Sequence, residues 1–469
     1  MNGTKEEELV YRAANLLREN LELKNQIKEL SEQYDKVLKD NERYEKLLSV
    51  VPKEYLPQGV NMEFGQRSIR FKMVTVMYMD IRGFKTISND KDPSNAIDEL
   101  DQILFHFDEI AEKYNLQKIK TIGDAYMCAG GLPNKNITNP IDVVLAALEM
   151  SDYLENLKIK YEKNDKNFWE LRIGIHTGSV TATQSGRKNI SYDIKGETVN
   201  IATRMASAAD TGKINASVYT YESIKEYFLT EYNGTIPVKY QGDLEMYYIR
   251  RLKLAYSVNR KIGRYPNEIF QVKYALRQFT DLQETILDKL EKELPSFLHY
   301  HNYKHTIDVV NQAELIGYGE GVDDQDILLL KTAALFHDSG HIIGYDNHEF
   351  FGTQIAREIL PKWKYTQEQI ERICKLIMAT KLPPNPQTLL EKIMCDADLD
   401  YLGRSDFIPV SNSLYDELRA QGKEIDINTW NKQQVKFLTG HQYFTNTAIR
   451  LREVGKEKQI ERLKKLIEE

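Results

Sequence analysis

Long apolar runs, cysteine pairs and an excess of basic residues are all missing from this chain of 469 residues. No window approaches the run of about 18 apolar residues that a membrane-spanning helix requires, and the acidic N-terminus has no apolar segment typical of a signal peptide. Cys128, Cys374 and Cys395 are widely spaced and predict no disulfide framework. A net charge of −7 argues against a general nucleic-acid or anionic-membrane surface. We therefore expect a cytoplasmic protein with no membrane span and no nucleic-acid partner.

Hydrophobic residues make up 41% of the chain, which is enough for packed cores, and the length predicts about three units. Shifts in the residue pattern give the boundaries. We predict a coiled coil over 5–52, a connector over 53–70, an α/β domain over 71–252, a linker over 253–269 and an all-α domain over 270–469.

Residues 5–52 carry seam residues in a 3–4 alternation over about six heptads, which end at Pro52. One seam position is largely leucine, and the other contains Asn20 and Asn41. Because a buried amide at such a position is satisfied only by its twin, the two asparagines favour a parallel homodimer. The alternative is a single amphipathic helix packed on the body of the protein.

The segment 71–252 alternates strand-like and helix-like stretches, which predicts an α/β fold. Asp80 ends the apolar run VTVMYMD, and Asp124 follows Gly123 in KIKTIGDAYM. A hairpin-like pairing of these strands would bring both carboxylates to one edge, where they could hold two divalent cations for attack at phosphorus. For either residue alone, a role in a turn or a helix cap is the alternative.

Four ordered blocks in this segment resemble the class III adenylate/guanylate cyclase catalytic domain: VTVMYMDIRGF, IKTIGDAYMCAGGLP, LRIGIHTG and YDIKGETVNIATRM. The resemblance implies a ferredoxin-like βαββαβ core and two Mg²⁺ or Mn²⁺ ions in each site. It assigns metal binding to Asp80 and Asp124, with the backbone carbonyl of Ile81 as a further ligand. It also implies that Asn200 orients the ribose. Arg204, on the same helix face, would stabilise charge on the transferring phosphoryl group.

The resemblance also predicts the nucleotide. Lys120 and Asp193 match the positions that read the purine in this family. A lysine donor and an aspartate acceptor suit adenine, since guanine reverses the donor and the acceptor, so the implied substrate is ATP. Phe84, in the IRGF stretch, is a further implied substrate contact. Gln241 stands where the family has a triphosphate-binding lysine, and Lys239 lies two residues earlier, on the same face of a strand, as a possible substitute.

In this family the metal side and the base-reading lysine face the Asn–Arg side of a partner subunit. The resemblance therefore implies that the sites form only in a dimer. This chain has one such segment carrying both halves, so a homodimer would build two equivalent sites. The predicted coiled coil favours the same pairing.

The all-α segment is rich in histidine: seven of the nine histidines lie between residues 299 and 441. His301 and His305 are four residues apart, and so are His337 and His341. This spacing predicts that each pair shares one face of a helix, where imidazoles can meet a metal.

The series YHNYKH, LFHDSGH, NHEFFG and DADLD, over about 295–445, resembles the HD-domain metal-dependent phosphohydrolases. The resemblance implies hydrolysis of a phosphoester with a divalent metal whose ligands are His305, His337, Asp338 and Asp398.

The HNxxH stretch is also similar to that of cyclic-nucleotide phosphodiesterases, whose first histidine protonates the leaving oxygen; here it is His301. His341 and His348 would serve a second metal or the phosphate. Thr380 and Lys381 stand where many relatives have another histidine, which argues against a complete two-metal site.

Other interpretations stay open at this stage. The cyclase could use GTP or a pyrimidine nucleotide. The HD domain could be the working enzyme beside a nucleotide-sensing cyclase fold, or a metal-stabilised domain that only regulates the cyclase. A dimeric scaffold without enzymatic activity would explain the coiled coil. It would explain neither the cyclase-like polar residues nor the histidines and aspartates of the HD-like segment.

Overall fold

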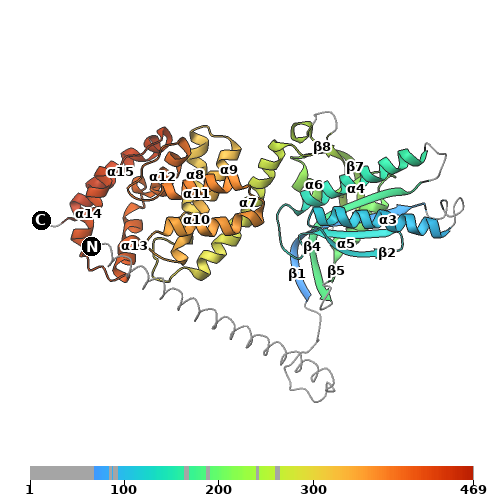
Figure 1. Ribbon diagram of the computed structural model, residues 1–469, viewed down its shortest axis with the longest axis horizontal. Helices are drawn as coiled ribbons and strands as arrows, with labels where there is room; N and C mark the ends of the chain where they lie inside the picture. Colours follow the sequence, from blue (N-terminus) through green and yellow to red (C-terminus); the bar gives the residue numbers. More distant parts are fainter. Residues whose placement is uncertain are drawn as a thin grey trace, which may run out of the picture. The chain divides into compact units, whose positions relative to one another are not determined.

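The computed structural model describes residues 68–83, 87, 93–162, 168–185, 191–238, 242–258, 263 and 265–467. The coiled coil predicted over 5–52 lies outside these residues, as do Phe84, Lys239 and Gln241, so these assignments stay predictions. Residues 69–182 and 191–469 belong to one compact unit, an α/β part followed by a helical part (Figure 1). None of its described helices is both long and apolar enough to cross a membrane.

The α/β part begins with the order β-α-β-β-α-β, the ferredoxin-like core predicted from the sequence. Its strands form one sheet in the order β2-β3-β1-β4-β6-β8-β7, with β5 paired to β4. The elements are β1 (Ser68–Arg82), α3 (Pro93–Lys113), β2 (Gln117–Ile122), β3 (Ala125–Gly130), α4 (Asn139–Glu162), β4 (Glu170–Ser185), β5 (Ser191–Lys195), α5 (Glu197–Ser207), β6 (Ile214–Ser217), α6 (Val218–Ile224), β7 (Phe228–Val238) and β8 (Gly242–Leu252).

Alternate residues of β1 face opposite sides of the sheet. Met77 and Met79 pack in one hydrophobic core with α3 and α4. Val74 and Val76 pack in another core with β5 and α5. Asp80 shares the alternation of Val74 and Val76, so it faces the side of the sheet that carries β5 and α5.

The part from residue 268 onward is helical, as predicted. Its helices are α7 (Glu268–Glu293), α8 (Tyr303–Gly319), α9 (Asp324–Phe336), α10 (His348–Ile359), α11 (Gln367–Ala379), α12 (Leu389–Asp398), α13 (Phe407–Ala420), α14 (Ile427–Gly440) and α15 (Asn446–Leu466), with short 3-10 turns η3 (Ser339–Ile342), η4 (Leu360–Trp363) and η5 (Asp400–Gly403). Another 3-10 turn, η2 (Leu254–Tyr256), lies between β8 and α7.

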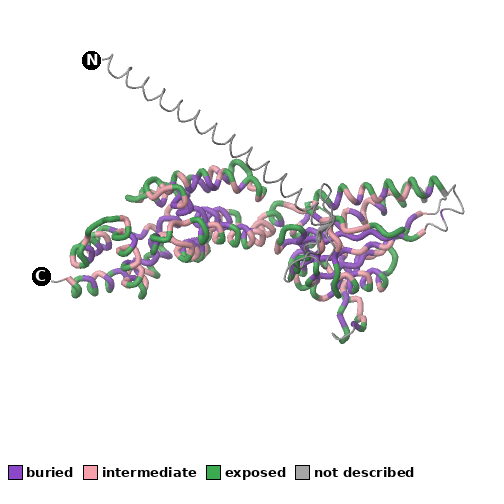
Figure 2. The backbone as a smooth tube through the Cα atoms, turned by 90° about the horizontal axis from the view of Figure 1, so that it is seen from below, coloured by how far each residue is buried: buried purple, intermediate pink, exposed green. Residues whose placement is uncertain are grey.

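Helix α7 belongs to both hydrophobic cores. Phe270, in its first turn, is buried in the core of the α/β part, whereas Phe279 and Leu282 are buried in the helical core. Figure 2 shows buried residues along the inner faces of both parts. The hydroxyl of Tyr274 also donates a hydrogen bond of 2.7 Å to the carboxylate of Asp142 on α4. The same helix is thus fixed by packing and hydrogen bonding to both parts.

Candidate functional site

The two aspartates of the α/β part come together through strand pairing. β1 pairs with β3 in antiparallel register, Asp80 lies opposite Ala125, and the backbone N–H of Ile81 donates to the carbonyl of Asp124 at 2.9 Å. Asp124 lies in the turn between β2 and β3. The predicted meeting of the two strand ends is therefore present, although β1 and β3 are neighbours in the sheet rather than a continuous hairpin.

The electrostatics indicate that both carboxylates lie close to one side chain. Burial raises the pKa of Tyr78, and the charges of Asp80 and Asp124 raise it further. The guanidinium Nε of Arg82 donates to Oδ2 of Asp80 at 2.7 Å. The end of β1 therefore carries negative charge, and the cationic side chain of Arg82 already binds there.

The base-reading pair predicted from the sequence lies together in one chain. Lys120 Nζ is 3.5 Å from Asp193 Oδ1, and their side chains are 40% and 48% exposed. Lys120 is opposite Met127 in the β2–β3 register, and Met127 packs in the core on the β5 and α5 side. The pair therefore lies on the same side of the sheet as Asp80. An exposed pair at this distance is weakly held, so an incoming ligand could replace either partner.

Helix α5 carries Asn200 and Arg204 on its exposed side. Arg204 Nη1 donates to the carbonyl of Pro237 at the end of β7, at 2.7 Å. Among the described residues, no contact joins Asn200 or Arg204 to Asp80 or Asp124. The structure brings together the aspartates, and Lys120 with Asp193, but it does not close these groups and α5 into one site within a single chain.

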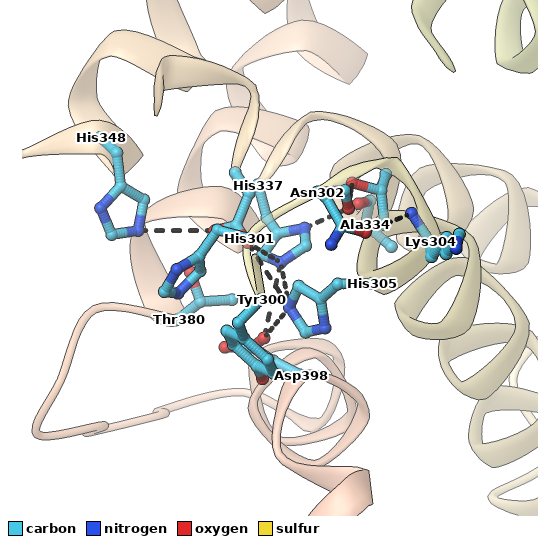
Figure 3. Close-up of polar contacts among 12 residues, drawn as sticks. Tyr300, His301, Asn302, Lys304, His305, Ala334, His337, His348, Thr380 and Asp398 are labelled. Atoms are coloured by element: carbon cyan, nitrogen blue, oxygen red, sulfur yellow. Dashed lines mark hydrogen bonds and ion pairs between the residues drawn. The ribbon is translucent and has the colours of Figure 1, made fainter. Parts of the chain in front are cut away.

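In the helical part, four ligand atoms converge. His305 Nε2 lies 3.2 Å from Asp398 Oδ1, 3.3 Å from His337 Nε2 and 3.4 Å from Asp338 Oδ2. His337 Nε2 lies 3.2 Å from Asp338 Oδ2 and 3.4 Å from Asp398 Oδ1. Figure 3 shows His305, His337 and Asp398 turned toward one another. The sequence-predicted ligand set is thus assembled in space.

Helix ends position these ligands. His305 lies in the first turn of α8, His337 directly follows α9, and Asp398 is the last residue of α12. The Nδ1–H of His337 donates to the carbonyl of Ala334 at 2.8 Å, so Nε2 is the ring nitrogen that faces the other ligands.

The histidines and carboxylates of this cluster also shift one another's pKa values. Burial lowers the pKa of His337, but the neighbouring carboxylates outweigh this effect and raise it well above its usual value. Burial also opposes ionisation of Asp338 and Asp398, yet the histidines hold the pKa of each carboxyl below its usual range. Both carboxylates are therefore ionised near neutral pH, as a cation site requires.

A second group of side chains adjoins the first at Asp338. His348 Nε2 lies 3.5 Å from Asp338 Oδ1, and the rings of His348 and His341 stack with centroids 4.0 Å apart. His301 and His341 have ring centroids 4.7 Å apart. His341 is buried, and among the described residues neither of its ring nitrogens has a hydrogen-bond partner. Thr380, drawn beside His301 in Figure 3, donates its hydroxyl to the carbonyl of Ile377 at 2.8 Å.

The expectation that each i, i+4 histidine pair shares a helical face is wrong. α8 begins at Tyr303, after His301, and α9 ends at Phe336, before both members of the second pair. One member of each pair enters the four-atom cluster, and the other enters the second group. Tight turns, rather than helical spacing, therefore separate the two groups.

Comparisons with known proteins agree with this geometry. Residues 67–251 match the family described as adenylate and guanylate cyclase catalytic domain, and residues 302–400 match the HD domain. The chain contains a nucleotidyl cyclase domain and an HD domain. The ordered sheet with its two strand-end aspartates belongs to the first, and the four-atom cluster to the second.

Both adenylate and guanylate cyclases are among the relatives. The receptor-type guanylate cyclase gcy-23 of Caenorhabditis elegans is 33% identical over 213 residues, which cover 45% of this chain and 20% of the relative. An adenylate cyclase of Mycobacterium bovis is 30% identical over 200 residues, covering 43% of this chain and 42% of the relative. The chain thus spans less than half the length of either protein.

Solved cyclases also match. The adenylyl cyclase CyaB of P. aeruginosa has 28% identity and a TM-score of 0.37, covering 42% of this chain and 100% of that chain. The catalytic core of a rhodopsin-guanylyl cyclase with converted specificity has 31% identity and a TM-score of 0.35, covering 39% of this chain and 97% of that chain.

One residue beside the HD site, Glu417, carries no recognisable signal in the sequence. Glu417, on α13, lies beyond the matched HD segment, and its side chain is fully buried. It accepts hydrogen bonds from the backbone N–H groups of Tyr300 and His301 at 2.9 and 3.0 Å, and its other oxygen lies 2.5 Å from His301 Nδ1. No motif in the sequence points to Glu417, because its role depends on α13 packing beside the turn before α8.

This contact changes the chemistry of His301. Burial lowers the pKa of His301, but the hydrogen bond from its ring to Glu417 and the charge of Asp338 raise it above its usual value. His301 is therefore suited to be protonated near neutral pH. Its Nδ1–H would donate to Glu417, and its Nε2–H would be the proton available to a substrate.

The cluster residues fit a divalent cation. Four ligands at about 2.1 Å in a tetrahedron are about 3.4 Å apart. Neighbouring ligands at about 2.3 Å in an octahedron are about 3.3 Å apart. The five observed separations of 3.2–3.4 Å agree with either arrangement. In the cyclase domain, the paired carboxylates of Asp80 and Asp124 are the ligand type that Mg²⁺ and Mn²⁺ prefer.

Proposed function

We propose that this protein is an adenylate cyclase that converts ATP to 3′,5′-cyclic AMP and pyrophosphate in a homodimer. The observation that carries the choice of base is the Lys120–Asp193 pair, 3.5 Å apart and on the same side of the sheet as Asp80. The lysine would donate to N1 of adenine, and the aspartate would accept from N6. With guanine, the lysine donor would face the N1–H donor, and the aspartate acceptor would face the O6 acceptor. Such mismatches are costly in a closed site.

In this reaction the ribose 3′-oxygen forms a bond to the α-phosphorus, the bond to pyrophosphate breaks, and the proton of the 3′-hydroxyl is released to water. Asp80 and Asp124 would hold two Mg²⁺ or Mn²⁺ ions, with the Ile81 carbonyl as a further ligand. Bound there, these ions would make the hydroxyl more acidic and offset the negative charge of the leaving phosphates. Asn200 would orient the ribose. Arg204 would donate to the phosphoryl oxygens where charge develops.

A dimer is part of the proposal because the catalytic groups are not closed into one site within a chain. Arg204 is exposed, and its guanidinium donates to the carbonyl of Pro237 rather than to either aspartate. Asn200 and Arg204 would therefore act on a nucleotide held by the partner's aspartates. The coiled coil predicted over 5–52 would hold the two chains in parallel. Lys239 and Phe84 remain proposed substrate contacts.

Product analysis tests this proposal. The purified protein is incubated with ATP, GTP, CTP or UTP and Mn²⁺ or Mg²⁺, and the products are separated by chromatography. We expect cyclic AMP from ATP, with activity reduced at least about 100-fold in Asp124→Ala and Arg204→Ala. Another cyclic nucleotide as the main product would refute the choice of base, and no cyclic product from any of the four would refute the proposal.

A Lys120→Glu variant tests the base contact directly. A glutamate would accept from the guanine N1–H and repel the adenine N1 lone pair, so the ratio of kcat/KM for ATP to that for GTP should fall at least about 100-fold. Lys72→Glu is the matched control. It makes the same charge change at an exposed residue near the start of β1, whereas Asp80 lies near the end of that strand, and it should leave the ratio unchanged. An unchanged ratio in Lys120→Glu would exclude this lysine as the base reader.

A second activity is proposed for the HD domain, hydrolysis of a phosphoester. It is favoured by the four-atom cluster together with His301, whose ring is held by Glu417. The bound divalent cation would supply a nucleophilic hydroxide from water. His301 would protonate the leaving oxygen, and His341 and His348 would contact the phosphate or a second cation. Hydrolysis of bis(p-nitrophenyl) phosphate or cyclic AMP that disappears in His337→Ala would support this activity. Equal rates in both proteins would contradict it.

A further inference from the structure

A cavity of about 480 Å³ lies where α7 crosses from the cyclase core to the HD core. Its lining comes from the end of α3 and the start of α4, from one face of α7, and from the segment around η4 and α11. The cavity is separate from the strand-end aspartates and from the HD cluster. Its volume lies within the range of about 300–1,000 Å³ that small-molecule sites occupy.

Aromatic rings form much of its wall: Tyr114, Tyr265, Tyr274, Trp363 and Tyr365. Three of their hydroxyls already have protein partners, because Tyr114 donates to Glu149, Tyr274 donates to Asp142 and Tyr365 bonds to Thr332. These three hydroxyls are therefore already used within the protein, and the rings contribute mainly apolar surface to the cavity. A planar heteroaromatic ring stacks well on such surfaces.

The polar groups that remain are few. The amides of Gln271 and Gln278 line the cavity and have no hydrogen-bond partner among the described residues. An amide offers both a donor and an acceptor, which matches the edge of a purine.

Three charged side chains line the cavity: Lys113, Asp142 and Lys364. Lys113 is paired with Glu149 at 2.7 Å, whereas the exposed ammonium of Lys364 has no ion-pair partner among the described residues. The backbone of Lys364 has φ 64, a left-handed conformation that glycine would adopt with less strain. A lysine side chain is therefore placed at the cavity at some conformational cost. The buried carboxylate of Asp142 also lines the cavity, and the positive charge of Lys364 lowers its pKa, against the stronger effect of burial. This carboxylate disfavours a ligand with several negative charges.

We propose that this cavity binds a purine 3′,5′-cyclic nucleotide. The purine ring would lie between aromatic side chains, with its edge on the Gln271 and Gln278 amides. The cyclic phosphodiester, with its single negative charge, would meet the Lys364 ammonium. The proposal rests on the proposed function for the source of the ligand, since the cyclase domain would release this molecule. A ligand here would contact the cyclase domain, α7 and the HD domain at once.

Tryptophan fluorescence provides a local readout, because Trp363 lines the cavity and the chain has three tryptophans in all. The full-length protein is titrated with cyclic AMP, and chromatography confirms afterwards that the nucleotide is intact. We expect a saturable change in emission that is lost in Trp363→Phe. Lys364→Ala and Gln278→Leu should each raise the midpoint at least about tenfold. Lys362→Ala is the matched control, because Lys362 is two residues away, 70% exposed and outside the lining.

The outcomes separate this proposal from the proposed function. Because the nucleotide is added, binding is measured whether or not the protein can make it, and Arg204→Ala should titrate like the wild type. A midpoint unaffected by Lys364→Ala and Gln278→Leu, or no saturable change, would overturn the cavity proposal alone. Tighter binding of ATP than of cyclic AMP would overturn the argument from charge.

Discussion

At the scale of single residues, buried charge determines what the HD site can do. Glu417 is removed from water, yet its pKa is lowered, because burial is outweighed by the hydrogen bonds and the charge that His301 and the adjacent backbone provide. A buried carboxylate with three donors is a rigid acceptor. Glu417 therefore keeps a proton on Nδ1 of His301 and leaves Nε2 as the nitrogen that can exchange a proton with a substrate.

Glu417→Gln should alter the pH profile of the proposed HD activity. The amide removes the negative charge, so the pKa of His301 should fall and less of it should be protonated near neutral pH. The alkaline limb of the rate profile should then move to lower pH, with a rate at pH 8 reduced at least about tenfold.

The profile is measured with bis(p-nitrophenyl) phosphate, and bound metal is measured by mass spectrometry. Metal content should not change, because Glu417 does not belong to the four-atom cluster. Glu424→Gln, at an exposed position, is the control. An unmoved alkaline limb in Glu417→Gln would refute the positioning role of this residue.

Asp142 makes a separate prediction about stability. Burial raises its pKa to about 6, although hydrogen bonds from Tyr274 and Thr138 partly oppose the shift. The folded protein therefore binds more protons than the unfolded chain between about pH 4 and 6, and the contribution of Asp142 to the free energy of unfolding falls as pH rises through this window.

The Asp142→Asn variant should lack this component, so its unfolding free energy should fall less than that of the wild type between pH 4 and 6. The difference should be at most about 3 kcal/mol. Urea unfolding of both proteins at several pH values measures it. Parallel pH dependences would contradict the raised pKa.

At the scale of elements, glycines permit close contacts that position the sites. A Cβ on Gly174 of β4 would lie 2.1 Å from the backbone N of Ala206 on α5, so only glycine lets the helix that carries Arg204 approach the sheet this closely. A Cβ on Gly340 in η3 would lie 1.9 Å from the carbonyl oxygen of His348. This second contact brings η3 against the start of α10 and allows His341 to stack on His348.

Gly340→Ala should therefore separate η3 from α10 and destabilise the HD domain by about 3 kcal/mol or more. Gly344→Ala, four residues later, is the matched control, because the nearest atom to its Cβ would be a ring carbon of Phe351 at 3.3 Å. Urea unfolding measures both variants. Equal stability of the two would show that the backbone at Gly340 can move without cost.

At the scale of the whole molecule, the main question is how catalytic groups on different surfaces meet. If sites are shared between subunits, two inactive variants with complementary defects should restore activity when mixed. Asp124→Ala damages the metal side and leaves α5 intact, whereas Arg204→Ala does the reverse. After random reassortment about half of the dimers are mixed, and each has one intact site out of two, so about a quarter of wild-type activity should return.

The two variants are unfolded together, refolded and assayed for cyclic AMP, with each variant refolded alone as the control. Recovery no greater than the sum of the separate proteins would contradict shared sites.

The sequence by itself determined the local chemistry and the class of each domain. The apolar run before Asp80, the helix repeat around Asn200 and Arg204 and the ordered HD blocks depend on short-range patterns, which is why they could be read directly. It also gave the four HD ligands, since their order along the chain is distinctive.

Only the tertiary structure decided which of these groups meet. It paired Lys120 with Asp193 across 73 positions of sequence, divided the histidine pairs between two groups and brought Glu417 to His301 across 116 positions. It also placed α7 in two cores, which forms the cavity beside Lys364. These contacts depend on how helices and strands pack through shape and burial, and a single sequence has no periodic signal for that.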